Sequence, residues 1–243
     1  MTATIHLFKG KTVSDKPTVI EAFPGKGYVS TIAAGQIIAA LDMELIGFID
    51  SDITAGITVV HDGTPLKPIQ IYAKNQFVVI YSEAVIPLDK IPEFSKALED
   101  WLNQIKPKEM ILLAGVTGTQ SNADHAIFTL CSHNACQTKL DALKVPHLKE
   151  GMMIGVSSEL LFWCRTNEVP YVSLMVETVY SPDPAAAASL LTILNDILGI
   201  KVDTAKLSEV GEEIEKKMKD ITEHVKRGRD GYKQMECDSP MYG

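Results

Sequence analysis

Arginine is the scarcest charged residue of this chain, and its scarcity excludes several functions. Only three arginines occur in 243 residues, at Arg165, Arg227 and Arg229, and the formal net charge is −8. A nucleic-acid partner is not expected, because neutralising backbone phosphates requires a basic surface. Phosphate-handling enzymes also favour the planar guanidinium fork, and residues 1–203 contain only one.

Cysteines and long apolar runs are scarce as well. Four cysteines are too few for a disulfide framework in a chain of this length. The sequence opens without a charged n-region followed by an apolar h-region, and no window is long and apolar enough to span a bilayer. We therefore expect a reduced, cytoplasmic protein without a membrane partner.

What remains is the composition of an ordinary globular protein, with 46% hydrophobic and 22% charged residues. Segments typical of strands alternate with segments of helical periodicity, and the clearest amphipathic helix covers Ile91–Ile105. The continuous apolar run Met110–Val116 is typical of a central strand covered on both faces. The alternation predicts an α/β fold with a mostly parallel sheet, helices on both faces and an inserted β-hairpin.

Two later helices have predicted ends. For a helix ending at Thr166, Ser157 or Ser158 is the candidate N-cap. The second helix contains the run of alanines at 185–188. Its candidate N-cap is Asp183, Pro184 suits the first helical position, and Gly199 suits the C-terminal end.

The C-terminal part differs from the rest and suggests three regions. Residues 1–203 form the predicted α/β domain, 204–227 a charged amphipathic helix and 228–243 a flexible polar tail. The helix has a narrow apolar seam, and its candidate oligomerisation residues are Val210, Ile214, Met218 and Ile221. Such a seam packs either on its own domain or against another helix in an oligomer.

The tail finishes on Met241, Tyr242 and Gly243. One interpretation is a frayed end with chance apolar residues. The other is a short peptide ligand, whose thioether, aromatic hydroxyl and terminal carboxylate suit a pocket with an apolar wall, a polar group and a lysine.

A sheet-edge crevice is the candidate small-molecule site. Gly25 and Gly27 belong to a glycine-rich turn before a helix, a place where backbone N–H groups can hold an anion. Thr117 and Glu177 follow apolar strands, where open α/β sheets bind ligands. We favour a tight packing turn and a structural crevice, because neither glycine motif is complete and no arginine or lysine lies in the Thr117 loop.

The sequence offers two further kinds of candidate site, a metal site and a nucleophilic catalytic site. The first is a metal site formed by His125, Cys131, His133 and Cys136. The gap of four residues between the two cysteines is within the range of structural zinc sites, but a second cysteine pair is missing. We therefore expect no metal. No nucleophile elbow and no Ser/His/Asp or Cys/His order stands out. We therefore expect no catalytic residue and no cofactor.

Several motifs in a fixed order resemble the archaeal proteasome-assembly-chaperone family. They are AFPGKGYVSTIAAGQII at 22–38, ILLAGVTGT at 111–119, LKEGMMIGVSSELLFWCRTNEVPYVSLMVET at 148–178 and YSPDPAAAASLLTILNDILG at 180–199. The resemblance implies an αβα sandwich related in outline to purine nucleoside phosphorylases. It also implies a non-enzymatic homo-oligomer, with a tetramer favoured.

The chain end is similar to the hydrophobic–Tyr–any-residue motif (HbYX) of proteasome activators and assembly factors. The resemblance implies that Met241 is an apolar anchor, Tyr242 the main aromatic contact and Gly243 the carboxylate donor, docking between 20S proteasome α-subunits. One departure is Lys26, where the family often has an apolar residue. The alternative is a nucleoside phosphorylase- or hydrolase-like enzyme on the same fold.

Overall fold

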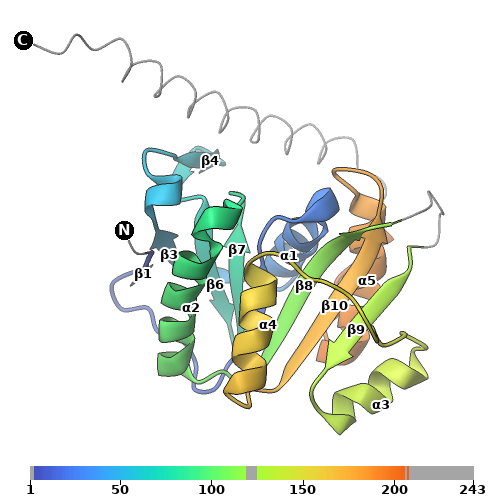
Figure 1. The fold of residues 1–243 in the computed structure, drawn as a ribbon. Helices are drawn as coiled ribbons and strands as arrows, with labels where there is room; N and C mark the ends of the chain where they lie inside the picture. The colour runs from blue at the N-terminus through green and yellow to red at the C-terminus, as the bar shows by residue number, and fades with distance from the viewer. Residues whose placement is uncertain (1–2, 119–124, 206, 208–243) are drawn as a thin grey trace, which may run out of the picture.

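The computed structural model describes residues 3–118, 125–205 and 207. Its centre is an eight-stranded sheet in the order β1-β3-β6-β7-β2-β8-β10-β9 (Figure 1). The strands are β1 (Thr4–Leu7), β2 (Thr18–Ala22), β3 (Glu44–Asp50), β6 (Ile69–Lys74), β7 (Phe77–Ser82), β8 (Glu109–Thr117), β9 (Ile127–Cys131) and β10 (Tyr171–Thr178).

The prediction of a mostly parallel sheet is confirmed at the centre of this sheet. Strands β7, β2, β8 and β10 run parallel to one another. The flanks are antiparallel, since β1, β3 and β6 pair in that sense with their neighbours and β9 pairs so with β10. A tight turn between β6 and β7 leaves room only for an antiparallel return, whereas the central strands are joined by longer crossovers.

Helices cover both faces of the sheet (Figure 1). They are α1 (Val29–Ala40), α2 (Ile91–Ile105), α3 (Asn134–Ala142), α4 (Val156–Thr166) and α5 (Pro184–Leu198). Helices α1 and α5 lie on one face, α2 and α4 on the other, and α3 lies beyond β9. The bounds of α2 match the predicted amphipathic helix, while α3 was not predicted.

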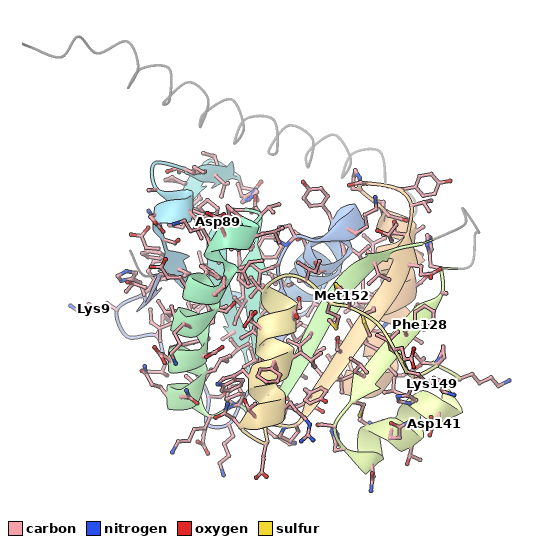
Figure 2. The ribbon with its side chains drawn as sticks, viewed as in Figure 1. Lys9, Asp89, Phe128, Asp141, Lys149 and Met152 are labelled. Carbon is pink, nitrogen blue, oxygen red and sulfur yellow. The ribbon has the colours of Figure 1, made fainter. Side chains whose placement is uncertain are left out.

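Each face has its own core, because successive side chains of a strand point to opposite faces. Ile20 of β2 and Ile111 of β8 belong to the core beneath α1 and α5. Val19 and Leu112 belong to the core beneath α2 and α4. Charged side chains such as Lys9, Asp141 and Lys149 lie on the outside (Figure 2).

The inserted β segment is more elaborate than the sequence suggests. Strands β6 and β7 form the predicted antiparallel hairpin. A separate two-stranded sheet joins β4 (Val59–His61) to β5 (Thr64–Leu66). Its turn contains Asp62 and Gly63, both with positive φ, and neither β5 nor this second small sheet was predicted.

The helix-end predictions have opposite outcomes. Asp183 is the N-cap of α5, and its carboxylate accepts a hydrogen bond from the Ala186 amide at 3.0 Å. The N-cap prediction for α4 is wrong, because Gly155 occupies that position with φ of 120°. The Ser157 hydroxyl is instead hydrogen-bonded to the buried Glu21 carboxyl.

The described chain ends in the core beneath α1 and α5, where Leu207 is fully buried. The predicted seam (Val210, Ile214, Met218, Ile221) and the tail residues Met241, Tyr242 and Gly243 lie outside the described residues. Within the part that is described, no helix is both long and apolar enough to cross a membrane.

Candidate functional site

The glycine-rich turn packs directly on the carboxyl ends of β8 and β10. Gly27 is buried with φ of 68°, and a Cβ at this position would come within 2.8 Å of Thr178 Cγ2. A Cβ at Gly115 of β8 would lie only 1.9 Å from the carbonyl oxygen of Lys26. The missing side chains therefore let the turn lie against the sheet, as the packing interpretation predicts.

Hydrogen bonds tie the end of β10 to this turn. The Asp183 amide donates to the Gly27 carbonyl at 2.9 Å, and the Thr178 hydroxyl donates to Asp183 Oδ2 at 2.5 Å. His125 lies at the same place, with Nε2 3.6 Å from Asp183 Oδ1 and Nδ1 3.0 Å from the Glu177 carbonyl oxygen. Internal side chains thus occupy much of the edge where an open α/β sheet binds a ligand.

The four crevice candidates are only partly brought together. Gly27 contacts the end of β10, but Gly25 is exposed and a Cβ there would meet nothing within 4 Å. Thr117 is exposed at the end of β8. Glu177 lies inside β10, in register with Val116, and not just beyond the strand as predicted.

The Cys/His group is split between two places. His125 lies beside Asp183, whereas Cys131, His133 and Cys136 lie at the opposite end of β9. Among the described residues no cluster of three or more His, Cys, Asp or Glu side chains is arranged to hold a metal ion.

Glu21 is a buried carboxyl that was not among the predicted site residues. It is fully buried on β2, accepts a hydrogen bond from the Phe23 amide at 3.1 Å, and its Oε2 has no partner among the described residues. Burial raises the pKa of Glu21 to about 7, and hydrogen bonds from Ser157 and Phe23 lower it only in part. No signal in the sequence separates it from a surface glutamate.

Glu83 is a second missed carboxyl, and it anchors the small hairpin. Its Oε1 lies 2.6 Å from His61 Nε2, while its Oε2 has no partner among the described residues. Burial raises the pKa of Glu83, and the neighbouring His61 opposes this shift. The pair joins the β4–β5 hairpin to the end of β7.

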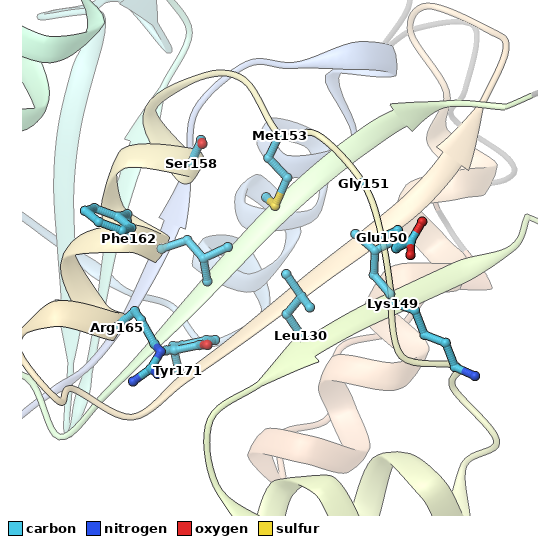
Figure 3. Close-up of a pocket in the computed structure, with 11 residues that line it drawn as sticks. Leu130, Lys149, Glu150, Gly151, Met153, Ser158, Phe162, Arg165 and Tyr171 are labelled. Atoms are coloured by element: carbon cyan, nitrogen blue, oxygen red, sulfur yellow. The ribbon is translucent and has the colours of Figure 1, made fainter.

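An open groove of about 420 Å³ lies beside α4 (Figure 3). Leu130 of β9 and Tyr171 of β10 line it, together with one side of α4 and segment 148–153. Arg165 also lines it and has no ion pair among the described residues. No pattern in the sequence indicates this groove.

Large apolar side chains of the groove and of the neighbouring segment are exposed on the protein surface. Met152 is 87% exposed, Ile154 71% and Phe162 69%, and Met152 projects outward beside the sheet (Figure 2). Clustered exposed apolar residues on soluble proteins commonly mark an interaction surface. In the sequence these residues belong to a run of three apolar residues, Met152 to Ile154, and nothing in that run indicates which of them is exposed.

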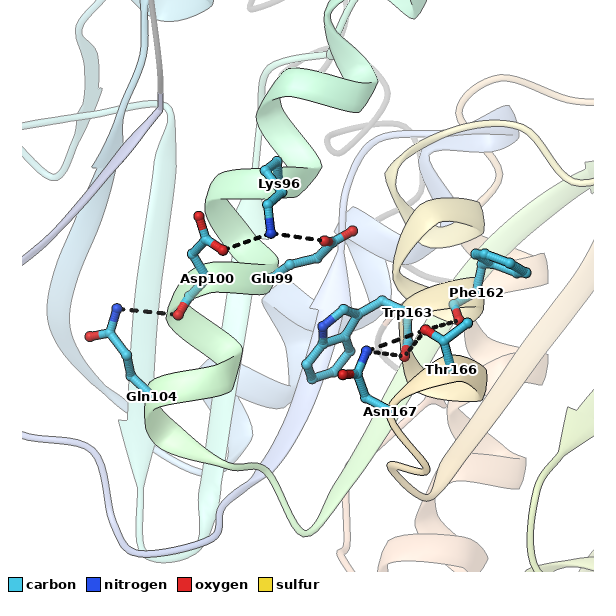
Figure 4. A network of polar contacts seen from close by, with 8 residues as sticks. All are labelled: Lys96, Glu99, Asp100, Gln104, Phe162, Trp163, Thr166 and Asn167. Carbon is cyan, nitrogen blue, oxygen red and sulfur yellow. Dashed lines mark hydrogen bonds and ion pairs between the residues drawn. The ribbon is translucent and has the colours of Figure 1, made fainter.

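Hydrogen bonds hold the helix that carries Phe162 at its C-terminal end (Figure 4). The Thr166 hydroxyl donates to the Phe162 and Trp163 carbonyls at 3.1 and 3.0 Å, and the Asn167 amide donates to the Trp163 carbonyl at 2.9 Å. On neighbouring α2, Lys96 lies 2.8 Å from Asp100. Side-chain hydrogen bonds to the Phe162 and Trp163 carbonyls therefore fix the turn of α4 that carries Phe162.

The fold is thus a three-layer α/β domain in which the carboxyl ends of the parallel strands, where such sheets usually bind ligands, are packed. An open groove with exposed apolar side chains lies elsewhere, beside α4. The chain belongs to the PAC2 family, which matches residues 19–222. It is 30% identical over 238 residues to an uncharacterized protein of Methanocaldococcus jannaschii, and the match covers 96% of each chain.

Solved structures of related proteins have the same fold. The Pyrococcus furiosus protein PbaA, described as an archaeal homolog of proteasome-assembly chaperone, matches with a TM-score of 0.83 and 27% identity, over 93% of this chain and 99% of that one. PbaB of the same organism, described as an archaeal proteasome activator, matches with a TM-score of 0.75 and 18% identity, over 91% and 99%. The expected likeness to purine nucleoside phosphorylases stays a prediction.

Proposed function

We propose that this chain is a non-enzymatic proteasome-assembly chaperone or ATP-independent activator that binds the α-ring of the 20S proteasome. The observation that carries the proposal is the similarity to PbaA, which extends over nearly the whole of both chains. Membership of the PAC2 family supports the same class. The cytoplasm, where 20S particles are accessible, is the proposed location.

The proposed contact is made by Met241, Tyr242 and Gly243. In this proposal Met241 packs against an apolar wall of a pocket between α-subunits, and Tyr242 contributes an aromatic ring with a hydroxyl for a polar partner. The terminal carboxylate of Gly243 pairs with a lysine of the α-subunits. Several tails on one homo-oligomer, with a tetramer favoured, bind more tightly together than singly, because each contact raises the effective concentration of the next.

The geometry of the sheet edge supports a binding protein over an enzyme. The turn at Gly27 and the side chains of Thr178, Asp183 and His125 occupy much of the edge where a substrate would lie in an open α/β sheet. Neither the family nor the similar structures support the nucleoside phosphorylase- or hydrolase-like alternative.

Tail variants test this proposal directly. Deleting Met241–Gly243, or changing Tyr242→Ala, is expected to abolish capture of 20S particles, while Tyr232→Ala in the same region leaves capture unchanged. Circular dichroism and size-exclusion chromatography of each variant establish that the body stays folded. Undiminished capture of 20S particles by the deletion variant would refute binding through the tail.

A further inference from the structure

The sheet face that carries α2 and α4 has apolar side chains beyond its last helix. Ile127 of β9 packs against the core beneath α1 and α5, so Phe128 and Leu130 of the same strand point to the opposite face. Neither of these two residues belongs to one of the two cores. Helix α4 packs on β8 and β10, and β9 is the last strand of the sheet. The groove beside α4 thus lies where the helical layer stops before the edge of the sheet.

Helix α4 has two stripes of side chains that matter here. One stripe is buried in the core beneath α2 and α4, and it consists of Val156, Leu160, Trp163 and Cys164. The other stripe lines the groove with the spacing of one helical face, and it consists of Ser158, Leu161, Phe162 and Arg165. Phe162 is 69% exposed. The second stripe therefore places an exposed ring one turn away from a guanidinium, on the same side of the helix.

The groove is locally basic on an acidic protein. Its lining includes two cations, Lys149 and Arg165, and one anion, Glu150, which gives a formal charge of +1 against −8 for the whole chain. Among the described residues neither cation has an ion pair. Arg165 and Tyr171 lie at one end of the groove, whereas the Lys149 side chain extends away from it (Figure 3). Arg165 is therefore the unpaired cation that a ligand in the groove meets.

We propose that this groove binds a short peptide segment of a partner protein in which large apolar side chains lie next to a glutamate or aspartate. The apolar side chains pack among Leu130, Leu148 and Phe162, which line the groove. The acidic side chain accepts the two parallel N–H groups of the Arg165 guanidinium. The volume of about 420 Å³ is within the range of about 300–1,000 Å³ that is common for ligand sites.

The charges give this contact its selectivity. A net charge of −8 repels an acidic partner from most of the surface, so an acidic segment is favoured only where an unpaired cation compensates it. A basic segment, in contrast, leaves Arg165 facing a like charge. The groove is separate from the proposed contact through Met241, Tyr242 and Gly243, so either proposal can fail alone.

Isothermal titration of the full chain with synthetic peptides, in the absence of 20S particles, tests the groove. The probe is a peptide with leucine, phenylalanine and glutamate side chains, blocked at both ends so that no terminal carboxylate is present. One matched peptide has lysine in place of glutamate, and another has serine in place of the apolar residues. We expect binding of the acidic peptide, about tenfold weaker binding of the lysine peptide and no binding of the serine peptide.

Variants of the groove assign the binding to its residues. Arg165→Gln is expected to weaken the acidic peptide about tenfold, and Arg165→Glu is expected to reverse the preference in favour of the lysine peptide. Phe162→Ser is expected to weaken both peptides about fivefold. Lys144→Glu is the matched control, because Lys144 is exposed and does not line the groove, and it is expected to leave binding unchanged. Circular dichroism establishes that each variant stays folded.

Four results would overturn the proposal. One is no heat of binding up to about 1 mM peptide, the weak end of specific association, and another is an unchanged preference in Arg165→Glu. Binding that appears only after deletion of 241–243 would make the chain's own end the occupant. Light scattering that shows a smaller oligomer for Phe162→Ser would make a second copy the occupant.

Discussion

The carboxyl edge of the parallel strands and the groove beside α4 differ in what fills them. At the edge, the Lys26 carbonyl oxygen of the glycine-rich turn lies 1.9 Å from the position that a Cβ of Gly115 would take, and Thr178 is hydrogen-bonded to Asp183. The groove has about 420 Å³ of open space and is lined by exposed Phe162, while Met152 and Ile154, on either side of the lining residue Met153, are exposed as well. In this PAC2 protein the carboxyl edge of the parallel strands is thus a packed contact between segments, called the packed edge below. The exposed apolar surface beside α4 is instead of the kind that commonly marks an interaction surface.

Placing a side chain at Gly115 is expected to have the largest effect among the changes at the edge of the sheet. Gly115→Ala places a Cβ 1.9 Å from the backbone oxygen of Lys26, and relieving this clash is expected to cost about 3 kcal/mol of unfolding free energy. Gly25→Ala is the matched control, because a Cβ there meets nothing within 4 Å. Chemical denaturation measures both, and equal losses would contradict the packed edge.

Neutralising Glu21 is expected to stabilise the protein only at higher pH. Its pKa rises from 4.5 unfolded to about 7 folded, so the folded state holds the proton more tightly and stability falls as pH rises from 4.5 to 7. Glu21→Gln removes this loss, which is about 3 kcal/mol at 1.36 kcal/mol per pKa unit. Chemical denaturation at pH 4 and pH 8 measures the difference in unfolding free energy between Glu21→Gln and the original chain. The same increase at both pH values would contradict a cost that comes from burying the charged carboxylate.

Removing the cap at the packed edge is expected to have a moderate effect. Asp183→Ala deletes the acceptor for the Ala186 amide and for Thr178, and loss of an N-cap costs about 1–2 kcal/mol. Asp183→Asn retains an acceptor and is expected to lose less. Thermal unfolding of the two variants compares them, and an unchanged midpoint for Asp183→Ala would argue against the bonded edge.

Changing the groove is expected to have the smallest effect on stability. Phe162 is 69% exposed, so Phe162→Ser is expected to change the unfolding free energy by no more than about 0.5 kcal/mol. The next residue is the control, because Trp163 is buried and Trp163→Ala is expected to cost about 3–5 kcal/mol. A large loss for Phe162→Ser would show that the residue belongs to the core.

Local patterns predicted much of the fold. The periodicity of Ile91–Ile105 and the cap formed by Asp183 before Pro184 depend on neighbouring residues, and both are found where predicted. The N-cap of α4 is Gly155 and not Ser157, and the interaction of Ser157 with Glu21 on β2 joins segments that are far apart in the sequence. Helix α3 lacks a strong apolar face, and polar residues fill most of its nine positions.

The site residues were harder to predict, for the same reason. The groove combines β9, β10, α4 and segment 148–153, and no sequence pattern shows that these segments meet. His125 was grouped with cysteines that follow it closely, but the fold places it beside Asp183. The crevice candidates were placed at the correct edge of the sheet, yet contacts between segments decide that this edge is packed.

The central claim is that the chain binds 20S particles through the carboxylate of Gly243 together with Met241 and Tyr242. Adding one alanine after Gly243 moves that carboxylate and leaves the other two side chains and the whole body unchanged. Size-exclusion chromatography with light scattering of each protein mixed with 20S particles is the most direct measurement. We predict a complex with the original chain and none with the extended chain, whereas equal complex formation by both would contradict the account.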